Sequence, residues 1–295
     1  MLEKLKIIDN RTEKLYSILT SCELCPRRCR VNRTAGEKGI CGTGKEIIIS
    51  SYGPHFGEEP ELVGIYGSGT IFLTHCNLLC VYCQNYEISH LGMGYTISEE
   101  ELAELMLNLK KRGCHNINLV TPTHFTPQIV KSLGYAIKKG LGIPVVWNCS
   151  GYENVEIIKM LDGIVDIYMP DIKYGDSEPA QKYSNASDYF ERCKESVEEM
   201  YRQVGDLKIN SKGIAEKGLL IRHLVLPNNL AGSEKVLKFI YGLSKNTYVN
   251  IMDQYSPCGN AHLYPEINRR PPEEEFEKVI KIAKKVGLHR GFKDI

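Results

Sequence analysis

The sequence lacks several features that would place it in a specialised class of protein. Its longest apolar runs, such as residues 117–120 and 143–146, have the length of a β-strand, far below the ~20 apolar residues of a membrane span. Lys and Arg number 37 against 36 Asp and Glu, so a net charge of +1 makes nucleic acid an unlikely partner. The opening stretch MLEKLKIIDNRTEK is charged and lacks the apolar core of a signal peptide. We therefore expect a cytoplasmic protein without a membrane partner.

Cysteine, by contrast, is abundant. The 295-residue chain contains 11 cysteines, an odd number, and shows no secretion signal. This combination argues against a disulfide framework and favours metal or redox chemistry. Seven of the 11 fall into two tight groups, residues 22–41 and residues 76–83. These two groups are the candidate chemical sites.

From residue 69 onward, apolar runs alternate with amphipathic helical runs. Strands are predicted at residues 70–74, 116–121, 143–148, 164–169, 219–226 and 247–252. Helices are predicted at residues 98–113, 126–140, 153–163, 187–205, 232–245 and 271–287. The first helix carries a capping box, with Ser98 followed three residues later by Glu101. The strands are continuously apolar, as in parallel strands covered on both faces. Periodicity alone leaves open a doubly wound sheet or a partial barrel, and both place ligands at the carboxyl ends of the strands.

The first candidate site follows the first of these strands directly. Cys76, Cys80 and Cys83 have the spacing C-x3-C-x2-C. Three thiolates on one loop can hold three irons of a [4Fe–4S] cluster, and the fourth iron is then open to a ligand. The alternatives are a zinc site completed by His75 or His90, and three unrelated core cysteines.

This loop resembles the cluster loop of the radical SAM superfamily, in which an aromatic residue such as Tyr82 precedes the third cysteine. The resemblance implies an α/β fold, a partial (β/α)6 TIM-type barrel, with a [4Fe–4S] cluster on Cys76, Cys80 and Cys83. It also implies that S-adenosylmethionine (SAM) binds the open iron. Reductive cleavage of SAM then produces a 5′-deoxyadenosyl radical that abstracts hydrogen from a substrate.

More of the chain is similar to the pyruvate formate-lyase-activating enzymes. Tyr-Cys-Gln-Asn at residues 82–85, Met-Pro-Asp-Ile-Lys at residues 169–173 and the arginine-bearing strand around residue 222 each resemble a segment of that branch. Where the activating enzymes have Gly-Gly-Glu and Asp-Thr-Asn-Gly, this chain has Val-Thr-Pro-Thr-His and Asn-Cys-Ser-Gly. The resemblance implies SAM contacts at Tyr82, Asn85, Asp171, Lys173 and Arg222. Further candidate contacts are the polar residues at the carboxyl ends of the second and third strands, namely Thr121, Thr123, His124, Asn148 and Ser150.

The second candidate site is the N-terminal set Cys22, Cys25, Cys29 and Cys41. Four thiolates can close a tetrahedral zinc site or fully ligate an iron–sulfur cluster, and the spacing leaves both open. The surrounding pattern also resembles a less characterised branch of activase-like radical SAM proteins. We expect residues 1–66 to form a small Cys-rich extension with this second metal, and residues 67–295 to form the barrel.

The expected protein is therefore a radical SAM oxidoreductase, with activation of a glycyl-radical enzyme as the favoured reaction. The expected partners are SAM, an electron donor such as flavodoxin or ferredoxin, and a protein substrate. Radical modification of a small molecule, a peptide or RNA stays open. A second alternative is a zinc-containing binding protein without catalytic activity.

Overall fold

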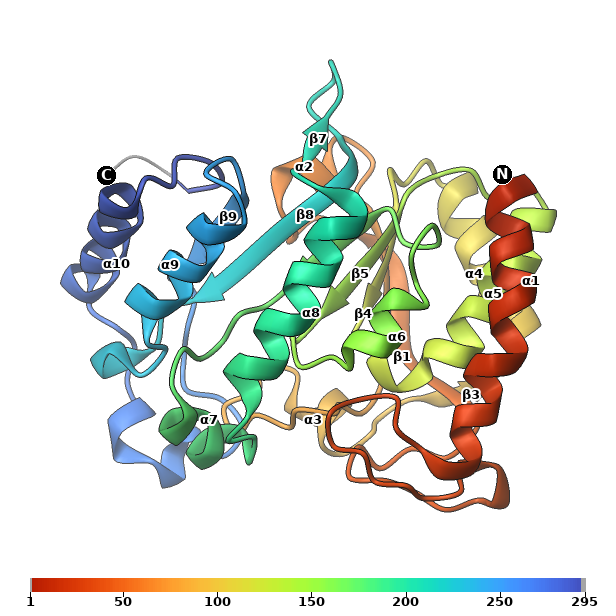
Figure 1. The fold of residues 1–295 in the computed structure, drawn as a ribbon, viewed down its shortest axis with the longest axis horizontal. Helices are drawn as coiled ribbons and strands as arrows, with labels where there is room; N and C mark the ends of the chain where they lie inside the picture. Colours follow the sequence, from red (N-terminus) through yellow and green to blue (C-terminus); the bar gives the residue numbers. More distant parts are fainter. Residues whose placement is uncertain (1, 293–295) are drawn as a thin grey trace.

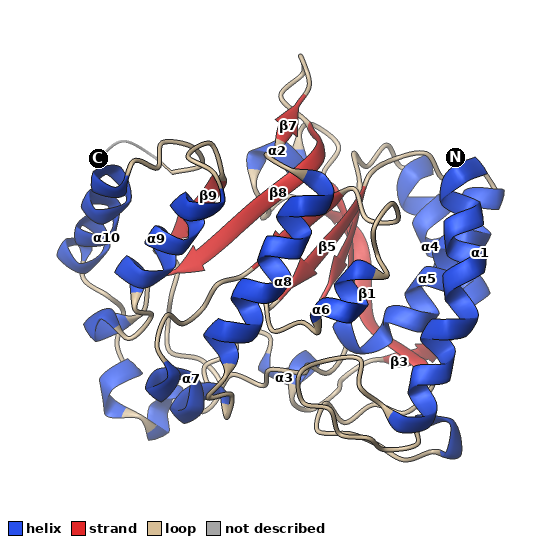
Figure 2. Cartoon of the chain, viewed as in Figure 1, coloured by secondary structure: helices blue, strands red, loops and turns tan. Residues whose placement is uncertain are grey.

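The computed structural model describes residues 2–292, and its centre is a mixed sheet with helices along its outer face (Figures 1 and 2). Six parallel strands are neighbours in chain order, and each is followed by a helix. The strands are β2 (Ser68–Leu73), β4 (Ile117–Val120), β5 (Val145–Cys149), β6 (Ile167–Pro170), β8 (Ala215–Leu224) and β9 (Tyr248–Met252). The helices are α4 (Glu99–Lys111), α5 (Thr126–Lys138), α6 (Val155–Lys159), α8 (Tyr189–Val204), α9 (Ser233–Leu243) and α10 (Glu273–Val286). The predicted partial (β/α)6 barrel is confirmed.

The local signals explain where these elements lie. The capping box at the start of α4 is present, because the Ser98 side chain accepts from the Glu101 amide and the Glu101 carboxylate accepts from the Ser98 amide. Every residue of β5 and β6 is buried, as expected for strands covered on both faces. The predicted helix at residues 153–163 is shorter than expected, since α6 ends at Lys159.

Several elements lie outside the six strand–helix pairs. Strand β1 (Ile47–His55) pairs antiparallel with β2 and with β3 (Tyr95–Ile97), so the sheet continues past the barrel strands. The short strand β7 (Lys208–Ile209) pairs with the start of β8. The other helices are α1 (Leu2–Ser17), α2 (Pro60–Val63), α3 (Tyr86–Ser89) and α7 (Ser177–Ser184). Turns of 3₁₀ helix lie at Ile18–Ser21, Arg33–Ala35, Thr123–Phe125, Pro227–Asn229, Ala261–Leu263 and Pro265–Ile267. The boundary at residue 66 stays a prediction, and β1 pairs with β2 across it.

The segment between β1 and β2 fills the inside of the barrel. Leu62 of α2 is fully buried in a cluster with Val146, Leu220 and Tyr248 from β5, β8 and β9. The Glu59 carboxylate accepts from Asn250 at 2.9 Å, and the Glu61 carboxylate accepts from the Tyr248 hydroxyl at 2.7 Å. In the part of the chain that the structure describes, no helix is long and apolar enough to cross a membrane.

Candidate active site

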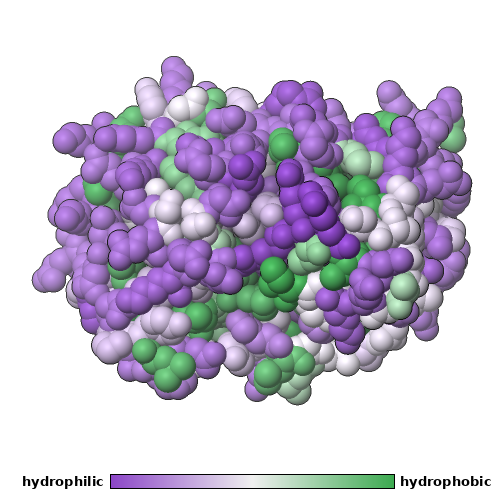
Figure 3. Space-filling view, turned by 60° about the horizontal axis from the view of Figure 1, so that its bottom comes forward, coloured by the Kyte–Doolittle hydropathy of each residue, from purple (hydrophilic) through white to green (hydrophobic). Residues whose placement is uncertain are grey.

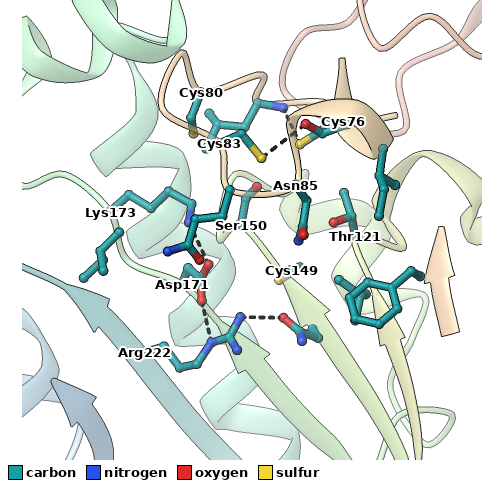
Figure 4. Close-up of a pocket in the computed structure, with 18 of the residues that line it drawn as sticks. Cys76, Cys80, Cys83, Asn85, Thr121, Cys149, Ser150, Asp171, Lys173 and Arg222 are labelled. Carbon is teal, nitrogen blue, oxygen red and sulfur yellow. Dashed lines mark hydrogen bonds and ion pairs between the residues drawn. The ribbon is translucent and has the colours of Figure 1, made fainter. Parts of the chain in front are cut away.

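A cavity of about 430 Å³ opens at the carboxyl ends of the parallel strands (Figure 4). This is the edge where β/α folds bind ligands. All three cysteines of the loop after β2 line it, and strands β4 to β8 supply the facing wall. The fold therefore brings the predicted cluster loop and most of the predicted SAM contacts to one place.

The three thiols occupy one wall of this cavity. The Cys76 sulfur accepts a hydrogen bond from the Leu78 amide at 3.3 Å, and the Ser89 hydroxyl donates to the Cys83 sulfur at 3.2 Å. Burial, with the neighbouring Cys80 next in importance, raises the pKa of the Cys76 thiol to about 12. Burial likewise raises the pKa of Cys80. An iron bound to these sulfurs would offset the cost of burying charged thiolates, because a metal ion stabilises the thiolate form.

The opposite wall is a partly buried ion network, in which the side chains are 15–17% exposed. Asp171, at the end of β6, accepts from Arg222 of β8 at 2.7 Å and from Lys173 at 2.7 Å. Arg222 also donates to the Asn148 side-chain oxygen at 2.8 Å. Burial alone raises the pKa of Asp171, but the charges of Arg222 and Lys173 outweigh burial and lower it. The carboxylate is therefore ionised and holds both cations toward the cavity.

The remaining predicted contacts divide into two groups. Tyr82, Asn85, Thr121 and Ser150 line the cavity. Thr123 and His124 do not: the Thr123 hydroxyl donates to Glu153 at 2.6 Å, and the His124 ring bonds the Thr74 carbonyl at 2.8 Å. Burial lowers the pKa of His124 to about 3, so its ring is neutral. Both residues shape the loop after β4.

Glu58 and Cys149 are among the residues that line the cavity but were not predicted to belong to the site. Glu58, from the segment inside the barrel, lies 3.3 Å from Arg222, and burial raises the pKa of its carboxyl. Cys149, at the end of β5, also faces the cavity. Cys149 could have been predicted to face the cavity, because it lies at the carboxyl end of a predicted strand. Glu58 carried no such signal, because its segment reaches the cavity only by folding back into the barrel.

The four N-terminal cysteines lie close together on a loop with little regular structure. A turn in which the Arg28 amide donates to the Cys25 carbonyl at 3.1 Å orders the loop. Two further bonds join residue 22 to residues 30 and 31. Burial raises the pKa of the Cys25 thiol, and the other three thiols add to the rise. None of the four lines the cavity.

The spacing of these side chains bears on the kind of metal they could hold. Among residues 2–292, no three His, Cys, Asp or Glu side chains are close enough together to enclose a single ion. A tetrahedral zinc needs all its sulfur ligands ~2.3 Å from one atom, whereas the thiolates of a four-iron cluster each bind a different iron. The absence of such a group among residues 2–292 applies equally to the three cavity thiols and to the four N-terminal thiols.

Comparisons with known proteins agree with this geometry. Residues 70–214 match the radical SAM superfamily. An uncharacterized protein of Methanocaldococcus jannaschii is 37% identical over 295 residues, covering 97% of this chain and 80% of that protein. A second protein of the same organism is 26% identical over 202 residues, covering 63% of this chain and 56% of that protein.

Among solved structures, a radical SAM methyltransferase from Sphaerobacter thermophilus gives a TM-score of 0.53 at 14% identity, covering 76% of this chain and 65% of that chain. At this identity the likeness shows the fold alone. Together with the family match across the cluster loop and the extended similarity to the relative, it leads to one conclusion: the chain belongs to the radical SAM superfamily.

Proposed function

We propose that Cys76, Cys80 and Cys83 hold the [4Fe–4S] cluster that membership of the family implies, and that SAM binds in the cavity beside them. The observation that carries this proposal is the arrangement of the cavity. Three thiols face it from one side, and an ionised Asp171 with two cations faces it from the other. The cluster supplies the electron that cleaves SAM into methionine and a 5′-deoxyadenosyl radical.

The residues of the facing wall have distinct roles in this proposal. Arg222 binds the SAM carboxylate, because a planar guanidinium suits that group. Its contact with Glu58, at 3.3 Å, is longer than its contact with Asp171, at 2.7 Å. The carboxylate of SAM therefore replaces Glu58, while Asp171 keeps Arg222 and Lys173 in place. Tyr82, Asn85, Thr121, Asn148 and Ser150 complete the SAM site.

The favoured reaction is hydrogen abstraction from a protein backbone, as in activation of a glycyl-radical enzyme. The resemblance of residues 82–85 and 169–173 to the activating enzymes supports it. A surface feature adds to that support: Leu91 and Met93 are 63% and 54% exposed beside the cavity residue His75. The face that holds the carboxyl ends of the strands also presents apolar side chains in its centre (Figure 3). Exposed apolar side chains are a feature of protein-binding surfaces.

Three further parts of the proposal concern the rest of the chain. Cys22, Cys25, Cys29 and Cys41 bind a second metal, zinc or an iron–sulfur cluster, within an extension that ends at residue 66. An electron donor such as flavodoxin or ferredoxin reduces the catalytic cluster. The cytoplasm stays the predicted location.

The experiment is anaerobic reconstitution followed by reduction with SAM and extract of the host cell. We expect 5′-deoxyadenosine, and a persistent glycyl doublet in the electron paramagnetic resonance spectrum that is absent for Cys80→Ala. Formation of 5′-deoxyadenosine without the doublet would move the substrate to a small molecule, another peptide or RNA. A colourless protein that binds only zinc would contradict the enzyme proposal altogether.

A further inference from the structure

Arg27 belongs to the N-terminal cysteine loop, residues 22–41. Its side chain reaches residues 76–83, which are called the catalytic loop because they carry the thiols of the proposed cluster. The Arg27 Nε donates to the Asn77 carbonyl at 3.0 Å, and its Nη2 donates to the Leu78 carbonyl at 3.2 Å. The same guanidinium bonds the carbonyls of Ser184 and Asn185, and it lies 5.2 Å from the centre of the Tyr152 ring. Arg27 is therefore held firmly between the two loops.

The two carbonyls on the catalytic loop belong to peptide units that contact Cys76. The Asn77 carbonyl shares its peptide unit with the Leu78 amide, which donates to the Cys76 sulfur at 3.3 Å. The Leu78 carbonyl shares its unit with the Leu79 amide, and a hydrogen bond from this amide lowers the pKa of Cys76 as the Leu78 bond does. A cation on a carbonyl oxygen polarises the peptide and strengthens the hydrogen bond of its N–H group. Arg27 thus acts on the Cys76 sulfur through two amides.

We propose that Arg27 is a positioning residue that raises the reduction potential of the catalytic cluster through these two peptide units, and so couples that potential to the N-terminal cysteine loop. This inference rests on the proposed cluster at Cys76. Hydrogen bonds to cluster sulfurs and a nearby positive charge both favour the reduced, more negative cluster. Reduction of the cluster is the step that must precede SAM cleavage.

The N-terminal loop determines where Arg27 lies. Arg27 sits inside the turn that joins the Cys25 carbonyl to the Arg28 amide at 3.1 Å. Cys25, at the start of that turn, is buried. A second contact joins the loops, since a side chain at Gly42 would come within 2.7 Å of the ring of His75, next to Cys76. A change at the thiols of the N-terminal loop would therefore alter the contacts that this loop makes with the catalytic loop.

The test is a redox titration of the reconstituted full chain, followed by the electron paramagnetic resonance signal of the reduced cluster. Arg27→Gln removes the charge, and Arg27→Lys keeps the charge but loses the paired donors. The matched control is Arg28→Gln, which removes the same charge from an exposed neighbour. Cys25→Ser tests the dependence on the N-terminal loop.

At the wild-type midpoint, we expect Arg27→Gln to lower the ratio of reduced to oxidised cluster about tenfold, which corresponds to 59 mV for a one-electron couple. Arg27→Lys should lie between Arg27→Gln and wild type, and Arg28→Gln should match wild type. Cys25→Ser should shift the ratio in the same direction. Adding Arg27→Gln to Cys25→Ser should then have less effect than it has alone, because the two act through one contact.

An unchanged midpoint in Arg27→Gln, or an equal shift in Arg28→Gln, would overturn the inference. A shift in Arg27→Gln with a wild-type midpoint in Cys25→Ser would overturn the coupling to the N-terminal loop. In each of these cases, the proposed function still stands if the wild-type protein holds its cluster and cleaves SAM. A wild type that binds no cluster would overturn both.

Discussion

The two cysteine loops lie at the same edge of the sheet, but their sulfurs face different surroundings. Residues 76–83 present three thiols to a cavity of about 430 Å³. Residues 22–41 turn four thiols toward one another, and none of them lines that cavity. A catalytic metal site keeps an open position, whereas a structural or relay site is closed by protein ligands. This difference supports the proposal that residues 76–83 carry the chemistry and that residues 22–41 have a supporting role.

The loops also differ in what fixes their backbones. The catalytic loop continues from β2 and bends through His75 and Leu79, which have positive φ values of 65° and 56°. Non-glycine residues adopt this conformation at some cost and commonly do so at functional sites. The N-terminal loop also bends through two such residues, Arg28 and Arg30, with φ values of 41° and 55°. It is anchored in addition by Arg33, whose buried guanidinium donates to the Gly44 carbonyl at 2.8 Å and to the His124 carbonyl at 2.7 Å.

The sharpest test of this comparison removes one thiol from each loop. Cys80→Ala should reduce SAM cleavage by about 10³-fold or more, because the cluster loses one of three ligands. Cys25→Ala should reduce it by about tenfold or less, since it acts through supporting contacts. The measurement is 5′-deoxyadenosine per bound catalytic cluster.

Cys114→Ala is the control for the loss of a thiol, because Cys114 is buried outside the cavity. It should retain near wild-type cleavage. Equal losses in Cys25→Ala and Cys80→Ala would remove the distinction between a catalytic and a supporting loop.

The next test addresses the wall opposite the catalytic loop. Asp171→Asn removes the carboxylate shared by two cations and leaves Arg222 only its longer ion pair with Glu58, and breaking a buried ion pair costs up to ~3–5 kcal/mol. We expect a loss of folding free energy of this order and weaker SAM binding, measured by denaturation and by titration with SAM. The control is Asp176→Asn, because its partner Lys235 is largely exposed and surface pairs contribute ~0–1 kcal/mol. Similar losses in both variants would contradict the role given to Asp171.

A smaller effect is expected at the anchor of the N-terminal loop. Arg33→Met leaves the carbonyls of Gly44 and His124 without their donor, at a cost of ~1–3 kcal/mol. Protection from hydrogen exchange should fall within residues 22–44 and stay unchanged in the barrel strands. Arg30→Met should leave exchange near wild type, because the exposed Arg30 pairs only with Glu23 on the surface. Loss of protection throughout the barrel would contradict a local anchor.

The barrel strands and the catalytic loop were predictable because their signals are local. Each strand is a continuous apolar run, the helix after Ser98 shows its capping box, and the thiols of Cys76, Cys80 and Cys83 lie within one loop. Asp171 and Arg222 were named from the resemblance of their segments to the activating enzymes, and both lie at the edge where the parallel strands end. The prediction of where the active site lies needed no knowledge of long-range packing.

The parts of the site that the sequence did not predict depend on contacts between segments that are distant in the sequence. Glu58 reaches Arg222 only because Leu62 buries its segment inside the barrel, and no periodicity marks that fold-back. Thr123 and His124 were assigned to SAM from their place after β4, but a 3₁₀ turn points them into hydrogen bonds with Glu153 and Thr74. The four carbonyl partners of Arg27 come from residues 77–78 and 184–185, far from Arg27 in the sequence, so no local pattern indicates them.

The region that joins the two loops contains the last test, Glu153. Its carboxyl accepts from Thr123, and the next residue, Asn154, donates to the Glu23 carbonyl of the N-terminal loop at 2.7 Å. Burial raises the pKa of Glu153 from 4.5 to about 8. Between these values the unfolded chain is ionised while the folded chain stays protonated, so this group's contribution to stability falls as pH rises.

Glu153→Gln cannot titrate, so its stability relative to wild type should rise with pH by up to about 1.4 kcal/mol per unit between pH 5 and 8, and level off above that. Urea denaturation of both proteins at pH 6 and pH 8 measures this difference. The exposed Glu156→Gln provides the matched control and should follow the wild-type profile. Parallel profiles for Glu153→Gln and wild type would mean that Glu153 is ionised when folded. The hydrogen bond from Thr123 would then go to a buried anion.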